Sequence, residues 1–336
     1  MILFLSSSVI MDNDDENHGL ESWTKIFDVG CGSFGQVFVA INHEPNYLFA
    51  IKSVQIDHTK MGQSRLKALE NEQKILQSLD CPHVIQCLGG NTTKKKNGTF
   101  KIVFLEYMVY GSLADFMKKA KGPFNEDFVR LYTKDMLLGL QYIHKMGIIH
   151  CDIKGNNVLL GTSGAKLADF GLAIRIGPDA EKCESATFRG TQLWMAPEVL
   201  NKREQGFPSD IWSLGCTVME LLTGDMPWTH TGTHVHHVIE CIRAGRMPKF
   251  PSCPCISAVG RDFIEKCLKF NADDRWSSFQ LLQHAFVRDS ITPSSTGKTF
   301  MEERIKSSCK VALSYDIEED KESKQALKKQ RIEFVG

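Results

Sequence analysis

Apolar and polar residues alternate along the first part of the chain. Residues 25–42 (KIFDVGCGSFGQVFVAIN) and 47–56 (YLFAIKSVQI) place apolar positions at every second residue on either side of a turn-forming NHEPN. This period predicts strands joined as a hairpin or meander. Residues 64–79 have a helical period, and residues 101–108 predict another strand after a loop at 91–99. The first hundred residues therefore predict a sheet with one main helix.

The spacing of apolar residues changes after Gly111. Residues 125–147 have a long helical period, and shorter helical periods recur near residues 209–223, 235–244 and 261–269. The second part of the chain therefore predicts a mainly helical lobe.

The chain has 336 residues, and a single hydrophobic core usually stops growing near about 250–300 residues. We therefore expect an α+β fold of two lobes with one site between them. The small β-rich N-lobe (about 23–108) would carry one main helix, and the larger, mainly helical C-lobe would span about 111–287. Residues 1–22 are expected to form a flexible segment, and residues 288–336 a partly ordered tail.

Composition limits the partners and the cellular location that we expect for this protein. Lys plus Arg and Asp plus Glu number 40 each, so we expect neither nucleic acid nor a membrane as a partner. The 11 cysteines show no small-domain disulfide framework, which indicates reduced thiols in a cytoplasmic protein. Residues 1–11 are apolar but lack the basic start of a secretory signal. A KKQR sequence near the C-terminus leaves a nuclear location open, and a start at Met1 or at Met11 is equally open.

The segment from Gly30 to Gly35 (GCGSFG) matches the pattern G-x-G-x-x-G. Without side chains, such glycines let backbone N–H groups approach phosphates closely. A dinucleotide-binding crossover uses the same pattern, but there the glycines open a helix. Here the β-rich QVFVAI follows, which favours a strand–loop–strand flap over a phosphate group, with a plain glycine-rich hairpin as the structural alternative.

Lys52 lies inside an apolar strand, where an ammonium group needs an anionic partner. The predicted helix at 64–79 has an apolar face defined by three leucines, Leu69, Leu76 and Leu79. At about 100° per residue, Glu72 falls in the middle of this face. We therefore predict an ion pair between Lys52 and Glu72, for which a purely structural salt bridge is the alternative.

The stretch HCDIKGNNVLL at 150–160 places several polar side chains between apolar flanks. Asp152 could accept a proton from a hydroxyl nucleophile, and Lys154 could neutralise phosphate charge. Asn157 offers an amide oxygen for Mg²⁺, and Asp169 in LADFGLA could supply a second metal ligand. Phosphoryl transfer needs such cationic and metal clamps together with an oriented hydroxyl. Either aspartate alone would more often be a turn residue, but this combination predicts phosphoryl transfer.

In order along the chain, GCGSFGQV, AIK with Glu72, HCDIKGNNVLL, DFG and APE resemble the motifs of the eukaryotic protein kinase family. The resemblance covers about residues 23–287 and implies the protein kinase fold with ATP and Mg²⁺ as cofactors. It implies four catalytic residues, Lys52, Glu72, Asp152 and Lys154. Asn157 and Asp169 would hold the metal.

The resemblance also implies where the nucleotide binds. Leu105 would lie at the back of the adenine pocket, and residues 106–108 would form the hinge whose backbone hydrogen-bonds adenine. The ATP contacts would come from the glycine-rich segment, the lysine strand and the hinge, namely Val29, Gly30, Cys31, Gly32, Ser33, Gly35, Val37, Ala50, Lys52, Glu106 and Met108.

Further landmarks of the family imply structural and regulatory positions. Asp210 and Arg275 would stabilise the fold, with the arginine paired to Glu198. The activation segment would run over residues 172–195. It contains two hydroxyls that are candidate phosphorylation sites, Ser185 and Thr187.

Lys154 and the dipeptide Gly190-Thr191 resemble serine/threonine kinases rather than tyrosine kinases. GSFGQV, DIKGNNVLL and GTQLWMAPEV resemble more closely the mitogen-activated protein kinase kinase kinases, and the compact chain resembles a plant-type member. This resemblance implies a mitogen-activated protein kinase kinase as substrate. The alternatives are a sterile-20-like kinase, a catalytically weak pseudokinase scaffold and, from G-x-G-x-x-G alone, a nicotinamide oxidoreductase. The oligomeric state is left open.

Cys151 departs from the family, most of whose members have arginine there. A guanidinium can pair with a phosphate on the activation segment, and a neutral thiol cannot. We therefore predict that phosphate on this segment raises activity less than in arginine-bearing relatives. Two other clusters are not expected to bind a metal. The histidines are interpreted as a surface loop running into a helix, because no cysteine or carboxylate of matching spacing completes a ligand set; they are His230, His234, His236 and His237. Cys253 and Cys255 are interpreted as incidental thiols in a proline-rich turn.

Overall fold

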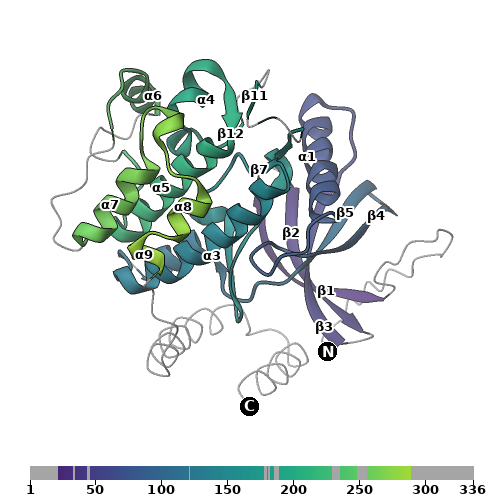
Figure 1. Ribbon diagram of the computed structural model, residues 1–336. Helices are drawn as coiled ribbons and strands as arrows, with labels where there is room; N and C mark the ends of the chain where they lie inside the picture. Colours follow the sequence, from purple (N-terminus) through teal and green to yellow (C-terminus); the bar gives the residue numbers. More distant parts are fainter. Residues whose placement is uncertain are drawn as a thin grey trace, which may run out of the picture. The chain divides into compact units, whose positions relative to one another are not determined.

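The computed structural model describes residues 22–32, 35–43, 46–120, 122–177, 180, 182–184, 189–228, 235–247 and 256–288. Within these residues a five-stranded antiparallel sheet with one helix precedes a mainly helical region (Figure 1). The predicted two-lobed α+β architecture is therefore confirmed. No helix in this described part is long and apolar enough to cross a membrane.

The N-lobe sheet has the strand order β1-β2-β3-β5-β4. Its strands are β1 (Trp23–Gly32), β2 (Gly35–His43), β3 (Asn46–Gln55), β4 (Cys87–Lys95) and β5 (Gly98–Glu106). Because side chains alternate between the two faces of a sheet, Phe49 and Ile51 enter one buried cluster with residues of β2 and β5. Lys52 and Val54 lie on the opposite face, where Val54 packs against Leu69.

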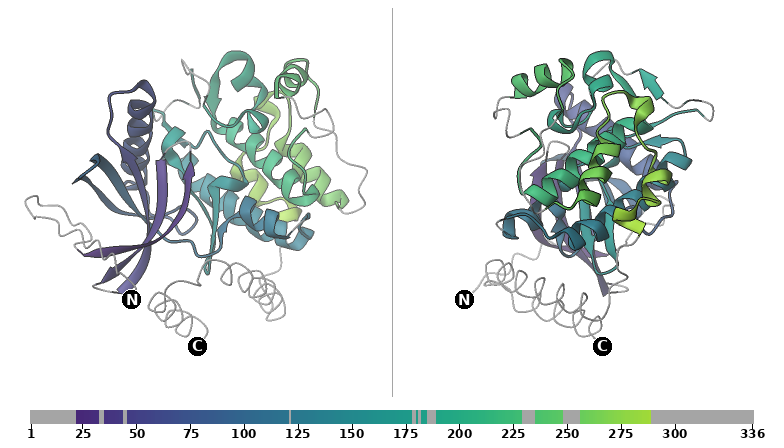
Figure 2. Two further views of the ribbon diagram at one scale, coloured as in Figure 1. Left: turned by 180° about the vertical axis from the view of Figure 1, so that it is seen from behind. Right: turned by 60° about the vertical axis from the view of Figure 1, so that its left-hand side comes forward.

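Helix α1 (Lys60–Leu76) lies beside this sheet and contacts β3, β4 and β5 (Figures 1 and 2). It begins four residues before the predicted start, because the Thr59 hydroxyl accepts the N–H of Gly62 and caps the helix. It ends three residues before the predicted end. The packing of Leu69 against the sheet turns the side of the helix that carries the buried Glu72 toward Lys52 of β3.

The loop predicted at 91–99 is mostly strand, and this prediction was wrong. β4 continues to Lys95 and β5 begins at Gly98, so only two residues form the turn between them. The sequence is polar because β4 is an edge strand, and exposed lysines are common on sheet edges. The lysines at 94–96 lie at the tip of this hairpin.

The C-lobe contains eight helices in the described residues, α2 (Leu113–Ala120), α3 (Glu126–Lys145), α4 (Pro197–Lys202), α5 (Phe207–Thr223), α6 (Val235–Arg243), α7 (Ala258–Cys267), α8 (Ser278–Leu282) and α9 (Ala285–Arg288). The four predicted helical periods correspond to α3, α5, α6 and α7, each within three residues. Every residue of α5 from Ser209 to Leu222 is buried. A helix covered on all sides forms the centre of a lobe, and the loops of the site are anchored to it.

Short strands and single turns carry the polar residues of interest. The strands are β6 (Gly111–Ser112), β7 (Ile148–Ile149), β8 (Val158–Gly161), β9 (Gly164–Leu167), β10 (Ile174–Arg175), β11 (Lys182–Glu184) and β12 (Glu204–Gly206). They form the sheets β6-β8-β9, β7-β10 and β11-β12. The β8–β9 hairpin places Asn157 directly before its first strand and Asp169 two residues after its second. Residues far apart in loops thus meet at one end of this hairpin.

Candidate active site

The Lys52 ammonium of β3 joins the two lobes. Its Nζ donates to Glu72 Oε2 on α1 at 2.6 Å and to Asp169 Oδ1 at 2.9 Å. The predicted pairing with Glu72 is therefore confirmed, and the structure adds Asp169 as a second partner. The Lys52 and Glu72 side chains are only 9% and 1% exposed, so water screens this pair poorly.

The three groups shift one another's pKa values. Burial opposes the charged form of Lys52, but the carboxylates of Glu72 and Asp169 outweigh it and raise its pKa above the ordinary value. Burial also opposes the charged form of Asp169, and there the Lys52 ammonium prevails and lowers the pKa. Burial raises the pKa of Glu72 despite the nearby ammonium. Lys52 is thus held as a cation and Asp169 as a carboxylate.

Asp169 begins the turn that follows β9. It has φ 62° and ψ 69°, a left-handed conformation that costs energy for a residue with a side chain. A single 3₁₀ turn, Phe170–Leu172, follows, and the Phe170 ring packs against the His150 ring at 4.6 Å between centroids. The strained backbone aims the Asp169 carboxylate at Lys52.

The Asp152 carboxylate is surrounded by donors. Lys154 Nζ and Asn157 Nδ2 each donate to Asp152 Oδ2 at 2.8 Å, and the Thr191 hydroxyl donates to Oδ1 at 2.7 Å. Lys154 Nζ also lies 2.6 Å from Thr191 Oγ1. The structure therefore brings together the three side chains predicted from residues 150–160 and adds Thr191, which lies 39 positions after Asp152.

The loop that carries Asp152 is fixed by Asp210 at the start of α5. Its Oδ2 accepts the N–H of His150 at 2.8 Å, and its Oδ1 accepts the N–H of Cys151 at 2.9 Å. His144 Nε2 bonds the same Oδ2 at 2.9 Å. Asp210 therefore stabilises the loop as predicted, because its buried carboxylate accepts two consecutive backbone N–H groups next to Asp152.

Cys151 lies on the inner side of this loop with φ 69°. Its side chain is 7% exposed, and its Sγ lies 3.6 Å from the carbonyl oxygen of Ile149. Burial, reinforced by the Asp210 carboxylate, holds the pKa of the thiol well above its usual range. The side chain is therefore neutral, as the sequence prediction assumed.

The predicted nucleotide contacts lie on β1, β2, β3, the last residue of β5 and the segment after it. Val29, Gly30, Cys31 and Gly32 close β1, and Gly35 and Val37 open β2, while Ser33 is outside the described residues. Pairing of β2 with β3 sets Val37 opposite Lys52. Gly35 has φ 129°, and a Cβ there would come within 2.5 Å of the Ser53 carbonyl oxygen. A side chain at Gly35 would therefore disturb the strand next to Lys52.

The hinge and the strands before it make contacts within the protein. Ala50 of β3 pairs with Leu105 of β5, and Met108 of the hinge is buried. The Glu106 side chain turns to Lys166 of β9, whose Nζ donates to both carboxylate oxygens at 2.7 and 2.8 Å. Only the backbone of Glu106 is thus left for the implied adenine contact, and its N–H already donates to the Gln86 carbonyl at 3.0 Å.

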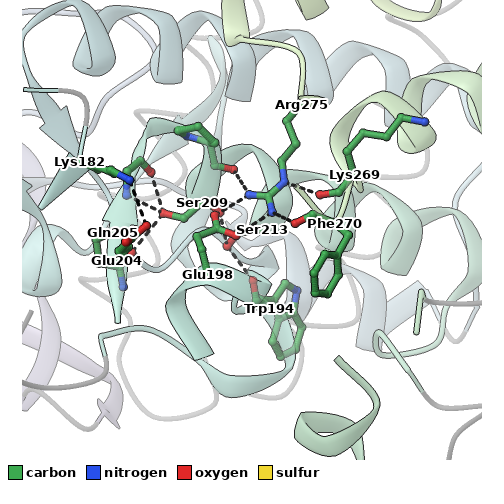
Figure 3. Close-up of polar contacts among 12 residues, drawn as sticks. Lys182, Trp194, Glu198, Glu204, Gln205, Ser209, Ser213, Lys269, Phe270 and Arg275 are labelled. Carbon is green, nitrogen blue, oxygen red and sulfur yellow. Dashed lines mark hydrogen bonds and ion pairs between the residues drawn. The ribbon is translucent and has the colours of Figure 1, made fainter. Parts of the chain in front are cut away.

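Arg275 anchors the segment that follows the site (Figure 3). Its Nη1 and Nη2 donate to the two Glu198 carboxylate oxygens at 2.6 and 2.7 Å, which confirms the predicted pair. Three backbone carbonyls accept from the same guanidinium, those of Pro208, Lys269 and Phe270. This contact fixes α4, which begins three residues after the Gln192–Trp194 turn.

Several sequence predictions fall outside the described residues. They include the candidate phosphorylation sites Ser185 and Thr187, and also His230, His234, Cys253 and Cys255. His236 and His237 lie on α6. Within the described ranges, no three His, Cys, Asp or Glu side chains gather into a group that could hold a metal ion.

A buried lysine here binds a carboxylate on the helix of the β-rich lobe and the aspartate that begins a turn in the helical lobe. A loop with an aspartate, a lysine and an asparagine lies in the same site. This arrangement is that of a protein kinase. The comparison with known families agrees, since the protein kinase domain model matches residues 23–287. The chain belongs to the protein kinase family, and it is a serine/threonine protein kinase.

Relatives with established names are similar to most of the chain. Mitogen-activated protein kinase kinase kinases 17 and 18 of Arabidopsis thaliana are each 40% identical to it. The alignments cover 79% of this chain and 69% and 77% of the two relatives. Mitogen-activated protein kinase kinase kinase 3 of the same plant is 36% identical over 79% of this chain but 40% of its own length. The predicted resemblance to plant kinases of this type is confirmed.

Two residues of the site escaped the sequence analysis. Thr191 was used only to distinguish serine/threonine from tyrosine kinases, although its hydroxyl reaches Asp152. Asn71 was not considered, yet its amide nitrogen lies 3.0 to 3.3 Å from three carbonyl oxygens that follow Asp169. Asn71 directly precedes Glu72, and this adjacency is the one signal that could have identified it.

The site fits a divalent metal with nucleotide phosphates. Both bonds from Asn157 to Asp152 use its amide nitrogen, and so the amide oxygen is the atom suited to a hard cation. The ionised Asp169 side chain is 28% exposed, and its bond to Lys52 is made by Oδ1. Two protein ligands suffice for Mg²⁺, because this ion usually keeps water and phosphate oxygens as its remaining ligands.

Proposed function

We propose that this kinase transfers the γ-phosphoryl group of ATP to a serine or threonine of a mitogen-activated protein kinase kinase. The activity class follows from the family. The substrate is supported by the names of the plant relatives, which are kinases of that level, and by their similarity over 79% of this chain.

The contacts support a role for each charged residue. Asp152 orients the acceptor hydroxyl and takes up its proton, and Lys154 stabilises the charge on the transferred group. Lys52, held by Glu72, binds the α- and β-phosphates. Asn157 and Asp169 would hold a divalent metal, which when bound neutralises phosphate charge.

The observation that carries this proposal is the Thr191 hydroxyl. It donates to Asp152 Oδ1 at 2.7 Å while Lys154 Nζ lies 2.6 Å from its oxygen. The Asp152 carboxylate is therefore shaped to accept an alcohol, with an ammonium next to that alcohol. A serine or threonine of the substrate needs this same environment while it attacks phosphorus.

The test of Asp152 uses the Asp152→Asn variant of the full chain. The amide keeps the shape but cannot accept the proton, so phosphotransfer to a general substrate should fall by at least roughly a thousandfold. Binding of ATP, measured by calorimetry, should stay within about threefold. Asp225→Asn makes the same chemical change at an exposed position and should keep wild-type activity. Wild-type activity in Asp152→Asn would exclude the assigned role.

The substrate is tested separately. The purified kinase and Mg-ATP are incubated with a catalytically inactive mitogen-activated protein kinase kinase, and modified residues are mapped by mass spectrometry. Phosphate on serine or threonine in the activation segment of that protein supports the proposal. Phosphotransfer to a general substrate without any to this protein would refute the proposed level in the cascade.

A further inference from the structure

The turn after Asp169 is held by side chains from two directions. Asn71 Nδ2 of α1 lies 3.2, 3.3 and 3.0 Å from the carbonyl oxygens of Phe170, Gly171 and Ala173. From a separate segment of the chain, Arg189 Nη1 donates to the Leu172 carbonyl at 3.3 Å. Four consecutive carbonyls are thus bound by two side chains that lie outside the turn.

This arrangement matters because Asp169 is strained. Its left-handed backbone persists only where the surrounding structure enforces it. Lys52 holds the Asp169 side chain, but a single ion pair would let the following backbone rotate. Asn71 and Arg189 hold that backbone directly, so that α1 is coupled to the turn through Asn71 as well as through Glu72.

Gly190 and Thr191, which follow Arg189, contact the loop that carries Cys151 and Asp152. The Arg189 carbonyl accepts from Gln205 Nε2 at 2.9 Å, which fixes its backbone. A Cβ on Gly190 would collide with the Cys151 carbonyl oxygen, so this glycine packs directly against the loop. Thr191 then reaches Asp152. Three consecutive residues thus connect the Asp169 turn, Cys151 and the Asp152 carboxylate.

Position 151 cannot contribute a charge to this connection, because its thiol is buried and neutral. Arg189 lines the same small cavity as Cys151, together with residues of α4 and α5. A guanidinium is therefore present next to position 151, but it comes from the end of the activation segment. It binds a backbone carbonyl of this chain, for which no phosphate is needed.

We propose that Asn71 and Arg189 are positioning residues that together hold the Asp169 turn ready for phosphotransfer, so that most of the activity is independent of phosphate on the activation segment. This inference rests on the proposed phosphotransfer activity. It assigns a task in that activity to two residues that touch neither ATP nor the acceptor.

The experiment uses the full chain after treatment with a broad-specificity phosphatase, with removal of phosphate checked by intact mass. The steady-state kcat and the KM for ATP are measured on a general substrate. Untreated and treated wild type should differ in kcat by less than about twofold. Asn71→Asp replaces a donor by a charge that faces three carbonyls, and should lower kcat by roughly tenfold or more.

Two comparisons separate positioning from a loss of folding. The KM for ATP of Asn71→Asp should stay within about threefold, because the glycine-rich segment and the hinge are unchanged. Gln63→Glu adds the same charge at an exposed position of α1 and should behave as wild type. Arg189→Met should lower kcat by roughly tenfold, and Arg189→Lys, which keeps a charged donor, should restore most of it.

Wild-type kcat in Asn71→Asp would overturn the proposal, as would equal losses in Arg189→Lys and Arg189→Met. A treated wild type that keeps less than about a tenth of the untreated rate would also overturn it, while the proposed function would still stand. Absence of phosphotransfer by untreated wild type would instead reject the proposed function, and with it this inference.

Discussion

The pair formed by Arg275 and Glu198 allows a quantitative test of what stabilises the C-lobe. The Arg275 side chain is fully buried, and it donates to both Glu198 oxygens and to three backbone carbonyls (Figure 3). The guanidinium also lies 5.0 Å from the centre of the Trp212 ring. We consider the Arg275→Met variant, which keeps the aliphatic stem and removes every donor.

The loss follows from the groups left behind. Glu198, whose side chain is 14% exposed, would lose its counter-charge, and three carbonyls would lose their donor. Removing one partner of a buried ion pair costs about 3–5 kcal/mol. For a protein of this size, about 2–4 °C of melting temperature corresponds to each kcal/mol. Arg275→Met should therefore melt roughly 6–20 °C below wild type in a calorimetric scan.

A second ion pair in the same lobe provides the control. Arg243 Nη1 and Glu240 Oε1 on α6 are 3.2 Å apart, but the two side chains are 46% and 69% exposed. Exposed pairs contribute about 0–1 kcal/mol, so Arg243→Met should lower the melting temperature by no more than about 4 °C. Equal losses in the two variants, or a loss below about 2 °C in Arg275→Met, would show that burial does not decide the strength of these pairs.

Two further predictions concern the site and the core behind it. Thr191→Val removes the hydroxyl that donates to Asp152, and should lower kcat by roughly 10- to 100-fold, whereas Thr191→Ser should keep most of the activity in the same assay. Burial raises the pKa of Glu220 from 4.5 to about 7. Between these values the folded state binds more protons than the unfolded one, so stability should fall by about 3 kcal/mol as pH rises from 4.5 to 7. Glu220→Gln should flatten this slope in melting curves, and an unchanged slope would contradict the assignment.

Local periodicity explains why much of the site could be predicted. A helix repeats about every 3.6 residues, so Leu69 and Leu76 of α1 define the side on which Glu72 must lie, and the pair with Lys52 follows. The order of polar residues between Asp152 and Asn157 is likewise contained in one short loop. Such inferences need only the geometry of a single element and the cost of burying an unpaired charge.

The errors were of a different kind. The polar run at 91–99 predicts a loop, but residues 91–95 form the end of the edge strand β4, which pairs with β5. Whether such a run forms a strand depends on the partner across the sheet, and a polar sequence is compatible with both outcomes. The start of α1 was placed too late because the cap at Thr59 lies outside the apolar pattern.

The sequence by itself determined the fold class, the partners Lys52 and Glu72, and the acidic and amide residues of the phosphotransfer loop. These features depend on residue type and on short-range periodicity. Only the tertiary structure decided that Thr191 reaches Asp152, that Asn71 and Arg189 hold the turn after Asp169, and that the Cys151 thiol is buried. These contacts join residues 17 to 102 positions apart, and their geometry is set by the packing of helices and hairpins against one another.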